Sequence, residues 1–130
     1  MFLYSFLYPR PKSRRFDYEH HLHVHMPLGL LLCKKHLGVE PKYFWIERID
    51  EDNAESEEQY AAVVHLAFEH EKDRDRLSDM IHVPEATELS ADYANYTESP
   101  PQVRKSRMIV ENKISDLISK TDQSRRVDSR

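Results

Sequence analysis

Glycine and cysteine are scarce in this sequence of 130 residues, which has two glycines, Gly29 and Gly38, and one cysteine, Cys33. Because a phosphate-binding loop needs several glycines close together, the sequence predicts no nucleotide or flavin cofactor. A single cysteine cannot form a disulfide within the chain, which favours a reducing compartment, the cytoplasm. Cys33 follows three leucines and is expected to be a buried apolar residue rather than a nucleophile.

Long apolar runs are also missing, since no stretch approaches the roughly 18 residues of a membrane-spanning helix. We therefore expect no membrane partner. Neither sign of charge dominates: 19 basic residues stand against 23 acidic ones. The acidic residues concentrate between positions 49 and 100 and the basic ones are dispersed towards both ends, which argues against a nucleic-acid partner.

Four segments have the composition of β-strands and two that of helices. The strands are expected at residues 1–8, 42–49, 59–69 and 102–110. The first helix is predicted from Asp17 to about Leu37, with Pro27 kinking or restarting it and Gly38 ending it. A short second helix is expected at residues 71–81, whereas residues 50–58 form an acidic connection and residues 84–101 are predicted to be irregular.

The order of these elements, β-α-β-β-α-β, predicts a ferredoxin-like α+β fold with a four-stranded antiparallel sheet and helices on one face. The first strand is apolar on both sides, so the face away from the helices needs a cover. We expect a second copy of the chain to supply it, which makes the protein a homodimer. The domain is expected to span residues 1–110, followed by a partly disordered C-terminal extension at 111–130.

Three segments, in family order, resemble the EthD family: residues 16–28 (FDYEHHLHVHMPL), 60–68 (YAAVVHLAF) and 91–97 (ADYANYT). In the first, seven positions fall in register with the family hallmark: Phe16, Asp17, Glu19, His25, Met26, Pro27 and Leu28. The resemblance implies a dimeric α+β barrel. It also implies a small hydrophobic or aromatic ligand, because family members occur beside ether-degradation and aromatic polyketide pathways and are often described as oxidoreductase-associated.

The segment at 16–28 also departs from the family hallmark. His20 and His21 replace its paired tyrosines, and His23 is an additional histidine. Because imidazole titrates near neutral pH and a tyrosine hydroxyl does not, the preferred ligand is expected to differ from that of relatives with tyrosines.

Three residues are candidates for catalysis. His25, just before Pro27, is the expected general acid or base, although a histidine bonded to backbone for packing reasons has the same spacing. Asp92 is expected to orient or charge-balance it, and Tyr96 to hydrogen-bond a substrate oxygen. Local turn formation is the alternative role for the segment that holds Asp92 and Tyr96.

Seven more residues are candidates for ligand binding: Tyr4, Asp17, His20, His21, Trp45, Asn95 and Thr97. Each has a competing structural role. Asp17 precedes a helix and suits an N-cap. Tyr4 and Trp45 lie on strands, where core or dimer-interface packing is the more common role of an aromatic residue.

The histidines between positions 20 and 25 also raise the question of a metal. On a helix, His21 and His25 share a face at a spacing of four, as do Glu19 and His23. No second set of ligands with strict spacing occurs elsewhere, and the direction of His65 on its strand is undetermined. The sequence therefore predicts pocket or surface histidines and no native metal site.

Two functions remain open at this point. One is a cofactor-free enzyme of an oxidoreductase-associated or proton-transfer, dehydration or cyclisation type, acting on an aromatic or polyketide-like substrate. The other is a non-catalytic binding or accessory protein for a hydrophobic metabolite. A purely structural dimer without an open pocket is a third interpretation, and it predicts apolar side chains filling the space beside His25.

Overall fold

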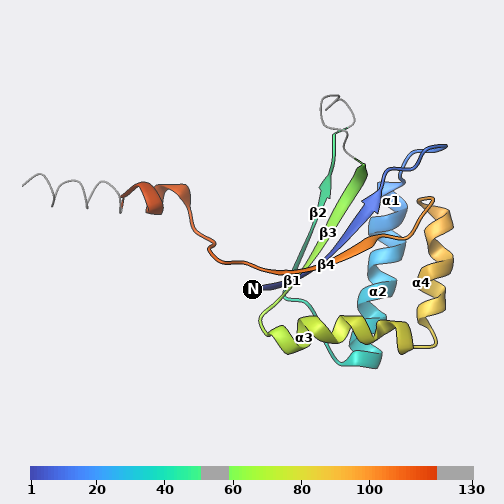
Figure 1. The fold of residues 1–130 in the computed structure, drawn as a ribbon. Coiled ribbons are helices and arrows are strands. Elements are labelled where there is room, and N and C mark those ends of the chain that lie inside the picture. Colours follow the sequence, from blue (N-terminus) through green and yellow to red (C-terminus); the bar gives the residue numbers. More distant parts are fainter. Residues whose placement is uncertain (51–58, 120–130) are drawn as a thin grey trace, which may run out of the picture.

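The computed structural model describes residues 1–50 and 59–119 (Figure 1). Its four strands form one antiparallel sheet in the order β2-β3-β1-β4. They are β1 (Phe2–Pro9), β2 (Tyr43–Arg48), β3 (Tyr60–Phe68) and β4 (Gln102–Arg107). The four predicted strands are confirmed, except that β4 ends three residues earlier than expected. Most of the expected acidic connection, residues 51–58, and residues 120–130 lie outside the described part of the chain.

The first helical segment runs from Tyr18 to Leu37 and has four parts: α1 (Tyr18–His20), a π-helical turn (His21–His25), α2 (Met26–Leu32) and a second π-helical turn (Cys33–Leu37). Pro27 has no N–H to donate to the carbonyl four residues before it. The N–H of Met26 instead bonds to the carbonyl of His21, five residues before it, which is the π pattern. The helix therefore restarts at Met26, as the proline predicts.

Gly38 ends this segment in the left-handed conformation, with φ of 65°. Replacing Gly38 by alanine is expected to lower the free energy of unfolding by about 1 kcal/mol, because an L-residue is strained at this φ. No described atom lies within 4 Å of the added Cβ, so backbone strain is the only cost. The control is Gly29→Ala in α2, whose Cβ would meet Leu89 Cδ2 at an ordinary 3.6 Å. Urea unfolding of both variants checks this, and equal stabilities would contradict it.

The rest of the helical layer comes from residues 71–95. The predicted second helix is present as α3 (Glu71–Arg76), which continues as a 3₁₀ turn (Leu77–His82). The prediction that residues 84–101 are irregular is wrong, because α4 (Ala86–Asp92) and a 3₁₀ turn (Tyr93–Asn95) lie there. The prolines around this stretch favoured a prediction of irregular structure, although the residues between them include good helix formers. Pro84 precedes the helix, where its missing N–H costs nothing.

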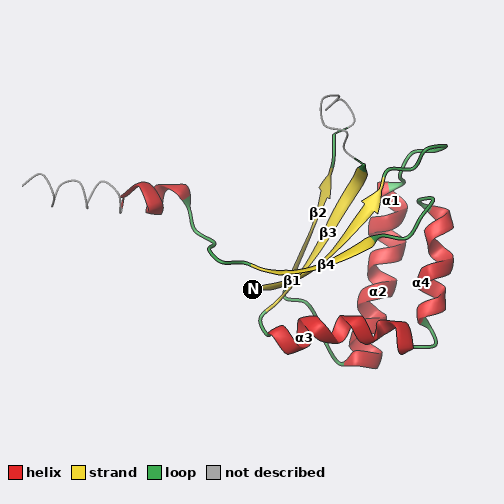
Figure 2. Ribbon diagram, in the orientation of Figure 1, coloured by secondary structure: helices red, strands yellow, loops and turns green. Residues whose placement is uncertain are grey.

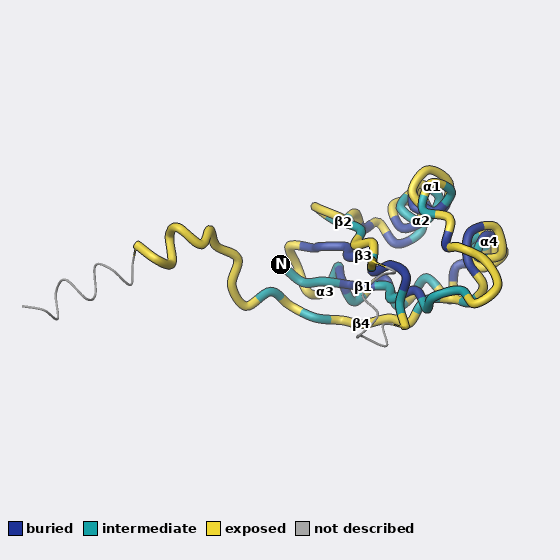
Figure 3. The backbone as a smooth tube through the Cα atoms, turned by 90° about the horizontal axis from the view of Figure 1, so that it is seen from above, coloured by how far each residue is buried: buried dark blue, intermediate teal, exposed yellow. Residues whose placement is uncertain are grey.

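All the described helices of this domain lie on one side of the sheet, as Figures 2 and 3 show. The buried core lies between the two layers and is largely aromatic and aliphatic on the sheet side, with Tyr4, Tyr8, Val64, Leu66 and Phe68 among its members. Cys33 is buried on the helix side, and burial raises the pKa of its thiol to about 11. The thiol is therefore protonated at neutral pH, and the expectation of an apolar, buried Cys33 is confirmed.

The other face of the sheet has no described helix over it. Tyr43 on this face is 57% exposed, and neighbouring Trp45 stacks on His65 with ring centroids 4.8 Å apart. His65 is held from both sides, by Ser5 Oγ at 2.7 Å from Nδ1 and by Glu47 Oε1 at 2.6 Å from Nε2. The face thus combines exposed aromatic rings with a hydrogen-bonded polar line across three strands.

After β4 the chain leaves the domain as an extended arm (Figure 1). Its isoleucines, its valine and its leucine at positions 109–118 are exposed, and residues 114–119 are helical. No helix within residues 1–50 or 59–119 has the length and apolar character needed to cross a membrane.

Candidate functional site

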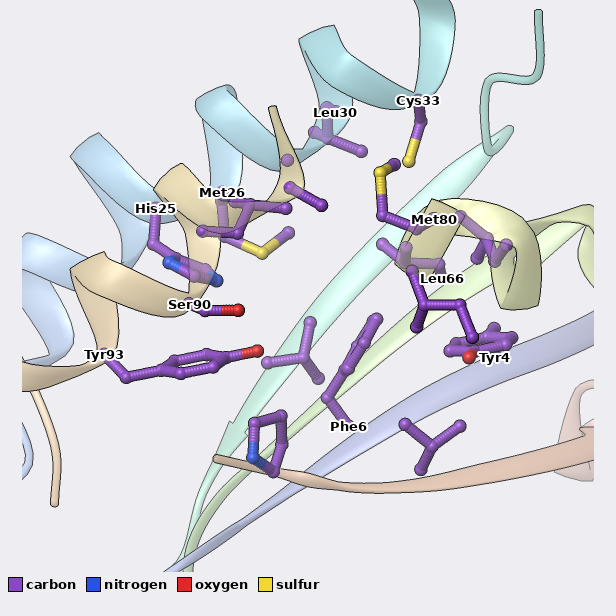
Figure 4. A pocket seen from close by; sticks show the side chains of 18 of the residues that line it. Tyr4, Phe6, His25, Met26, Leu30, Cys33, Leu66, Met80, Ser90 and Tyr93 are labelled. Atoms are coloured by element: carbon purple, nitrogen blue, oxygen red, sulfur yellow. The ribbon is translucent and has the colours of Figure 1, made fainter. Parts of the chain in front are cut away.

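A cavity of about 410 Å³ lies between the sheet and the helical layer. Its floor is made by side chains of the central strands, and its walls come from α2 and α4 (Figure 4). Most of the lining is apolar, including Tyr4, Phe6, Met26, Leu30 and Leu66. A cavity of this size and character is suited to a small organic molecule with one or two rings.

His25 brings a titratable group to this apolar cavity, and Asp92 stands behind it. His25 Nδ1 lies 3.0 Å from Asp92 Oδ2. The other carboxylate oxygen, Oδ1, lies 2.8 Å from His20 Nε2 and accepts a hydrogen bond of 2.9 Å from the amide of Asn95. One carboxylate therefore holds two histidines, and the residues come from the first helical segment and the end of α4.

The charges of this cluster follow from its surroundings. Burial by itself would raise the pKa of Asp92, but hydrogen bonds from Asn95, His20 and His25 outweigh it and lower that pKa. Burial lowers the pKa of His25, with Asp92 acting in the opposite direction. At neutral pH Asp92 is therefore a carboxylate and His25 a neutral imidazole.

This charge state fixes the tautomer of His25. A carboxylate only accepts hydrogen bonds, so His25 Nδ1 carries the proton and donates it to Asp92. Nε2 is left with a lone pair, and it has no hydrogen-bond partner among the described residues. The ring of His25 lines the cavity, close to Ser90 and Tyr93 (Figure 4). Nε2 is thus positioned as a base for a molecule in the cavity.

The π-helical turn explains how two histidines five residues apart reach one carboxylate. In an α-helix, residues five apart point about 140° away from each other. The i→i+5 bonding of a π turn places such residues nearly above one another. His20 and His25 flank the carboxylate of Asp92 because the turn between them is π-helical.

His21 lies behind His25 among aromatic rings. It is 1% exposed, and its ring centroid lies 5.2 Å from those of Tyr8 and Tyr96. Neither ring nitrogen has a hydrogen-bond partner within the described ranges. Burial, followed by repulsion from His25, lowers the pKa of His21 to about 4. His21 is therefore an uncharged ring at neutral pH and contributes to the cavity wall.

Tyr96 is fully buried and does not line the cavity. Its hydroxyl donates to the hydroxyl of Tyr8 at 2.9 Å, and burial raises the pKa of both phenols. The prediction that Tyr96 bonds a substrate oxygen does not fit this geometry. Tyr8 does line the cavity, as do Tyr4 and Tyr93.

Of the five remaining predicted residues, two belong to the cavity or to the cluster around Asp92, and three do not. Tyr4 lines the cavity, whereas Asn95 acts on Asp92. Asp17 is an N-cap, since its carboxylate accepts from the N–H of His20 at 3.0 Å. Thr97 is buried, its hydroxyl has no partner in the described part of the chain, and it does not line the cavity. Trp45 lies on the opposite face of the sheet and does not line this cavity, so its contact with a ligand stays a prediction.

Sequence reasoning did not find Tyr8, Ser90 and Tyr93, which supply polar groups to the lining. Tyr93 and Ser90 are three residues apart, and this helical spacing was the available signal. It was missed because residues 84–101 were not predicted to be helical. Tyr8 lies on the same strand face as Tyr4, so alternation along the strand could have found it.

Within residues 1–50 and 59–119, no group of three or more His, Cys, Asp or Glu side chains is placed to hold a metal ion. His23 pairs with Glu19 at 3.2 Å on the exposed side of the helix, at the predicted spacing of four. His65 faces the side of the sheet that the described helices leave uncovered.

The architecture is similar to that of a solved structure. No family model and no curated protein matches the sequence. Among solved structures, the crystal structure of an EthD-like protein from Ralstonia eutropha JMP134 superposes with a TM-score of 0.62. The match covers 86% of this chain and 95% of that chain, at 22% sequence identity. The chain has an EthD-like fold. The resemblance seen in three sequence segments is thus confirmed at the level of the EthD-like fold.

Proposed function

We propose that the protein is a cofactor-free enzyme that moves a proton on a small aromatic or polyketide-like molecule held in the cavity. The observation that carries this proposal is the lone pair of His25 Nε2 at an apolar cavity, with the Asp92 carboxylate on the opposite ring nitrogen. A neutral imidazole backed by a carboxylate is a general base, and its conjugate acid is stabilised by the same carboxylate.

The proposed step begins at a C–H next to a carbonyl, or at a phenol or enol O–H. Nε2 takes the proton, and the electron pair stays on the substrate as an enolate or phenolate. The imidazolium then returns the proton to another carbon or to a departing hydroxyl, which leaves as water. Isomerisation, cyclisation and dehydration are all of this type, and none of them requires electron transfer.

A carrier of hydrophobic metabolites is the second candidate. The predominantly apolar lining favours it, because binding alone needs no base. Mass spectrometry of small molecules that co-purify with the folded protein tests both. An aromatic or polyketide-like compound with a removable proton supports the enzyme, and one with no such proton supports the carrier. A protein that retains neither, and binds no fluorescent phenol such as 2-naphthol, would contradict both.

We also propose that two copies pair through the uncovered face of the sheet to form a dimeric α+β barrel, and that the protein works in the cytoplasm. Exposed Tyr43 and partly exposed Trp45 on this face support the pairing, since burying them removes apolar surface from water. The single, unpaired Cys33 supports the compartment.

Replacing Tyr43 by aspartate is expected to weaken the dimer at least about tenfold, because an unpaired carboxylate would be buried between the two sheets. The matched control is Phe44→Asp: Phe44 is the next residue of β2, is also exposed, and points to the opposite face. Sedimentation equilibrium of wild type and both variants measures the effect. A monomeric wild type, or equal weakening by both substitutions, would refute the pairing.

A further inference from the structure

The cluster around Asp92 contains a histidine that the proposed base does not need for its own orientation. His25 is oriented by Asp92 Oδ2, yet His20 occupies the other oxygen at 2.8 Å. The side chain of His20 is 25% exposed, while those of Asp92 and His25 are each 10% exposed. The three side chains therefore lead from the cavity towards solvent.

We propose that His20 is a charge-compensating partner of His25, holding a proton against Asp92 while His25 is neutral and releasing it to water as His25 takes a proton from the substrate. This inference rests on the proposed function, because it assigns a role to His20 in the same proton transfer. His20 does not touch the cavity, so it is a positioning residue that acts through Asp92.

The proton balance of this exchange is complete. Before the transfer, His20 is an imidazolium, Asp92 a carboxylate and His25 a neutral ring. One proton passes from the substrate to Nε2 of His25, and one passes from Nδ1 of His20 to water. The cluster then has the same net charge as before, with the positive charge moved from His20 to His25. Asp92 remains a carboxylate throughout.

Electrostatics favours such an exchange in a buried cluster. One carboxylate neutralises one imidazolium, and a second positive charge on the same carboxylate is repelled by the first. The positive charge of His20 accordingly lowers the pKa of His25, in addition to the larger effect of burial. Asn95, the third group on Asp92, is an amide and contributes no titratable proton.

The other groups that face the two histidines leave this coupling intact. Tyr96 stacks on His20 with centroids 6.0 Å apart, and Tyr93 contacts the ring of His25 at 5.4 Å; burial raises the pKa of both phenols, so they stay neutral. His21 beside His25 is neutral as well. Asp17 accepts the backbone N–H of His20. Among these described neighbours, Asp92 is the charged group that both imidazoles share.

The test follows the titration of each histidine by NMR in the ligand-free, full-length protein. In His20→Gln, the glutamine amide can still donate to Asp92 but carries no charge. The pKa of His25 is expected to rise by about one unit relative to wild type, because the repelling charge is gone. The matched control is His23→Gln, on the exposed side of the same segment and paired with Glu19, which is expected to leave His25 unchanged.

A second variant keeps the inference testable if His20→Gln fails to fold. In His20→Asn the shorter amide also carries no charge, so the pKa of His25 is expected to rise by a similar amount. Unchanged midpoints in both variants, or an equal change in His23→Gln, would overturn the proposal. Because no turnover is measured, this outcome is independent of whether His25 proves to be a catalytic base.

Discussion

Replacing His25 by glutamine is expected to slow proton abstraction in the cavity by about 10²- to 10⁴-fold, the usual contribution of a positioned general base. Glutamine can still donate to Asp92, so the site keeps its hydrogen bond and loses only the lone pair of Nε2. A suitable probe is 5-nitrobenzisoxazole, an apolar aromatic molecule. Removal of the C–H proton of its isoxazole ring breaks the N–O bond and releases a coloured phenolate, so the rate is read directly by absorbance.

The wild-type rate is also expected to fall in acid, because a protonated His25 has no lone pair. Burial lowers the pKa of His25 below its ordinary value, so the midpoint of the fall should lie below pH 6.5. The control is His23→Gln, which changes an exposed histidine of the same segment. If His25→Gln binds 2-naphthol as tightly as wild type and both accelerate the probe equally, the base assignment is wrong and the carrier is favoured.

Between pH 6.5 and pH 4 the protein is expected to lose about 3 kcal/mol of stability through His21 alone. This loss follows from the pKa of His21, which is lower by about 2.5 in the folded state than in the unfolded state. The pKa of His21 is about 4 in the folded protein and ordinary when unfolded. The unfolded chain therefore binds the proton first as the pH falls. The stabilising contribution is complete above pH 6.5 and is lost on the way down to about pH 4. His25, whose pKa is also lowered, adds to the loss in the same direction.

The variant His21→Phe should remove most of this dependence, because phenylalanine has no proton to bind and its ring suits the neighbouring Tyr8, Phe16 and Tyr96. Urea unfolding at several pH values between 4 and 7 measures it. Stability curves of wild type and His21→Phe that run parallel over this range would contradict the assignment. Carboxylates with a lowered pKa, such as Glu98, also make the protein less stable in acid. Their effect is the same in both proteins, so it cancels in the comparison.

The strands could be predicted from the sequence because their residues carry the information locally. Aromatic side chains at every second position, as in Phe2 to Tyr8, are typical of a strand, and the order of the elements then selects the fold. The helix at Ala86–Asp92 could not be predicted in the same way. Its seven residues are too few to show a convincing period, and its stability comes from packing against α2.

The candidate site was predictable as a set of residues but not as an arrangement. His25 and Asp92 are separated by 67 positions, and no spacing rule connects them. His20 was expected to touch a ligand, because an α-helical period gives no reason for it to share a carboxylate with His25. Tyr96 was expected to reach a substrate, whereas in the structure its hydroxyl bonds to that of Tyr8 and it does not line the cavity.

The π-helical turn in the first helical segment also limits which insertions and deletions the chain can tolerate between His20 and His25. Four residues separate His20 from His25, and only a turn that accommodates one extra residue brings both rings to the same side. A protein with three residues between its two histidines would reach the same alignment on an ordinary helix. Shortening this chain by Leu22 would therefore spare the pairing, whereas a further residue inserted there would turn one imidazole away from its carboxylate. Alignments of such proteins should accordingly tolerate a one-residue gap between the two histidines.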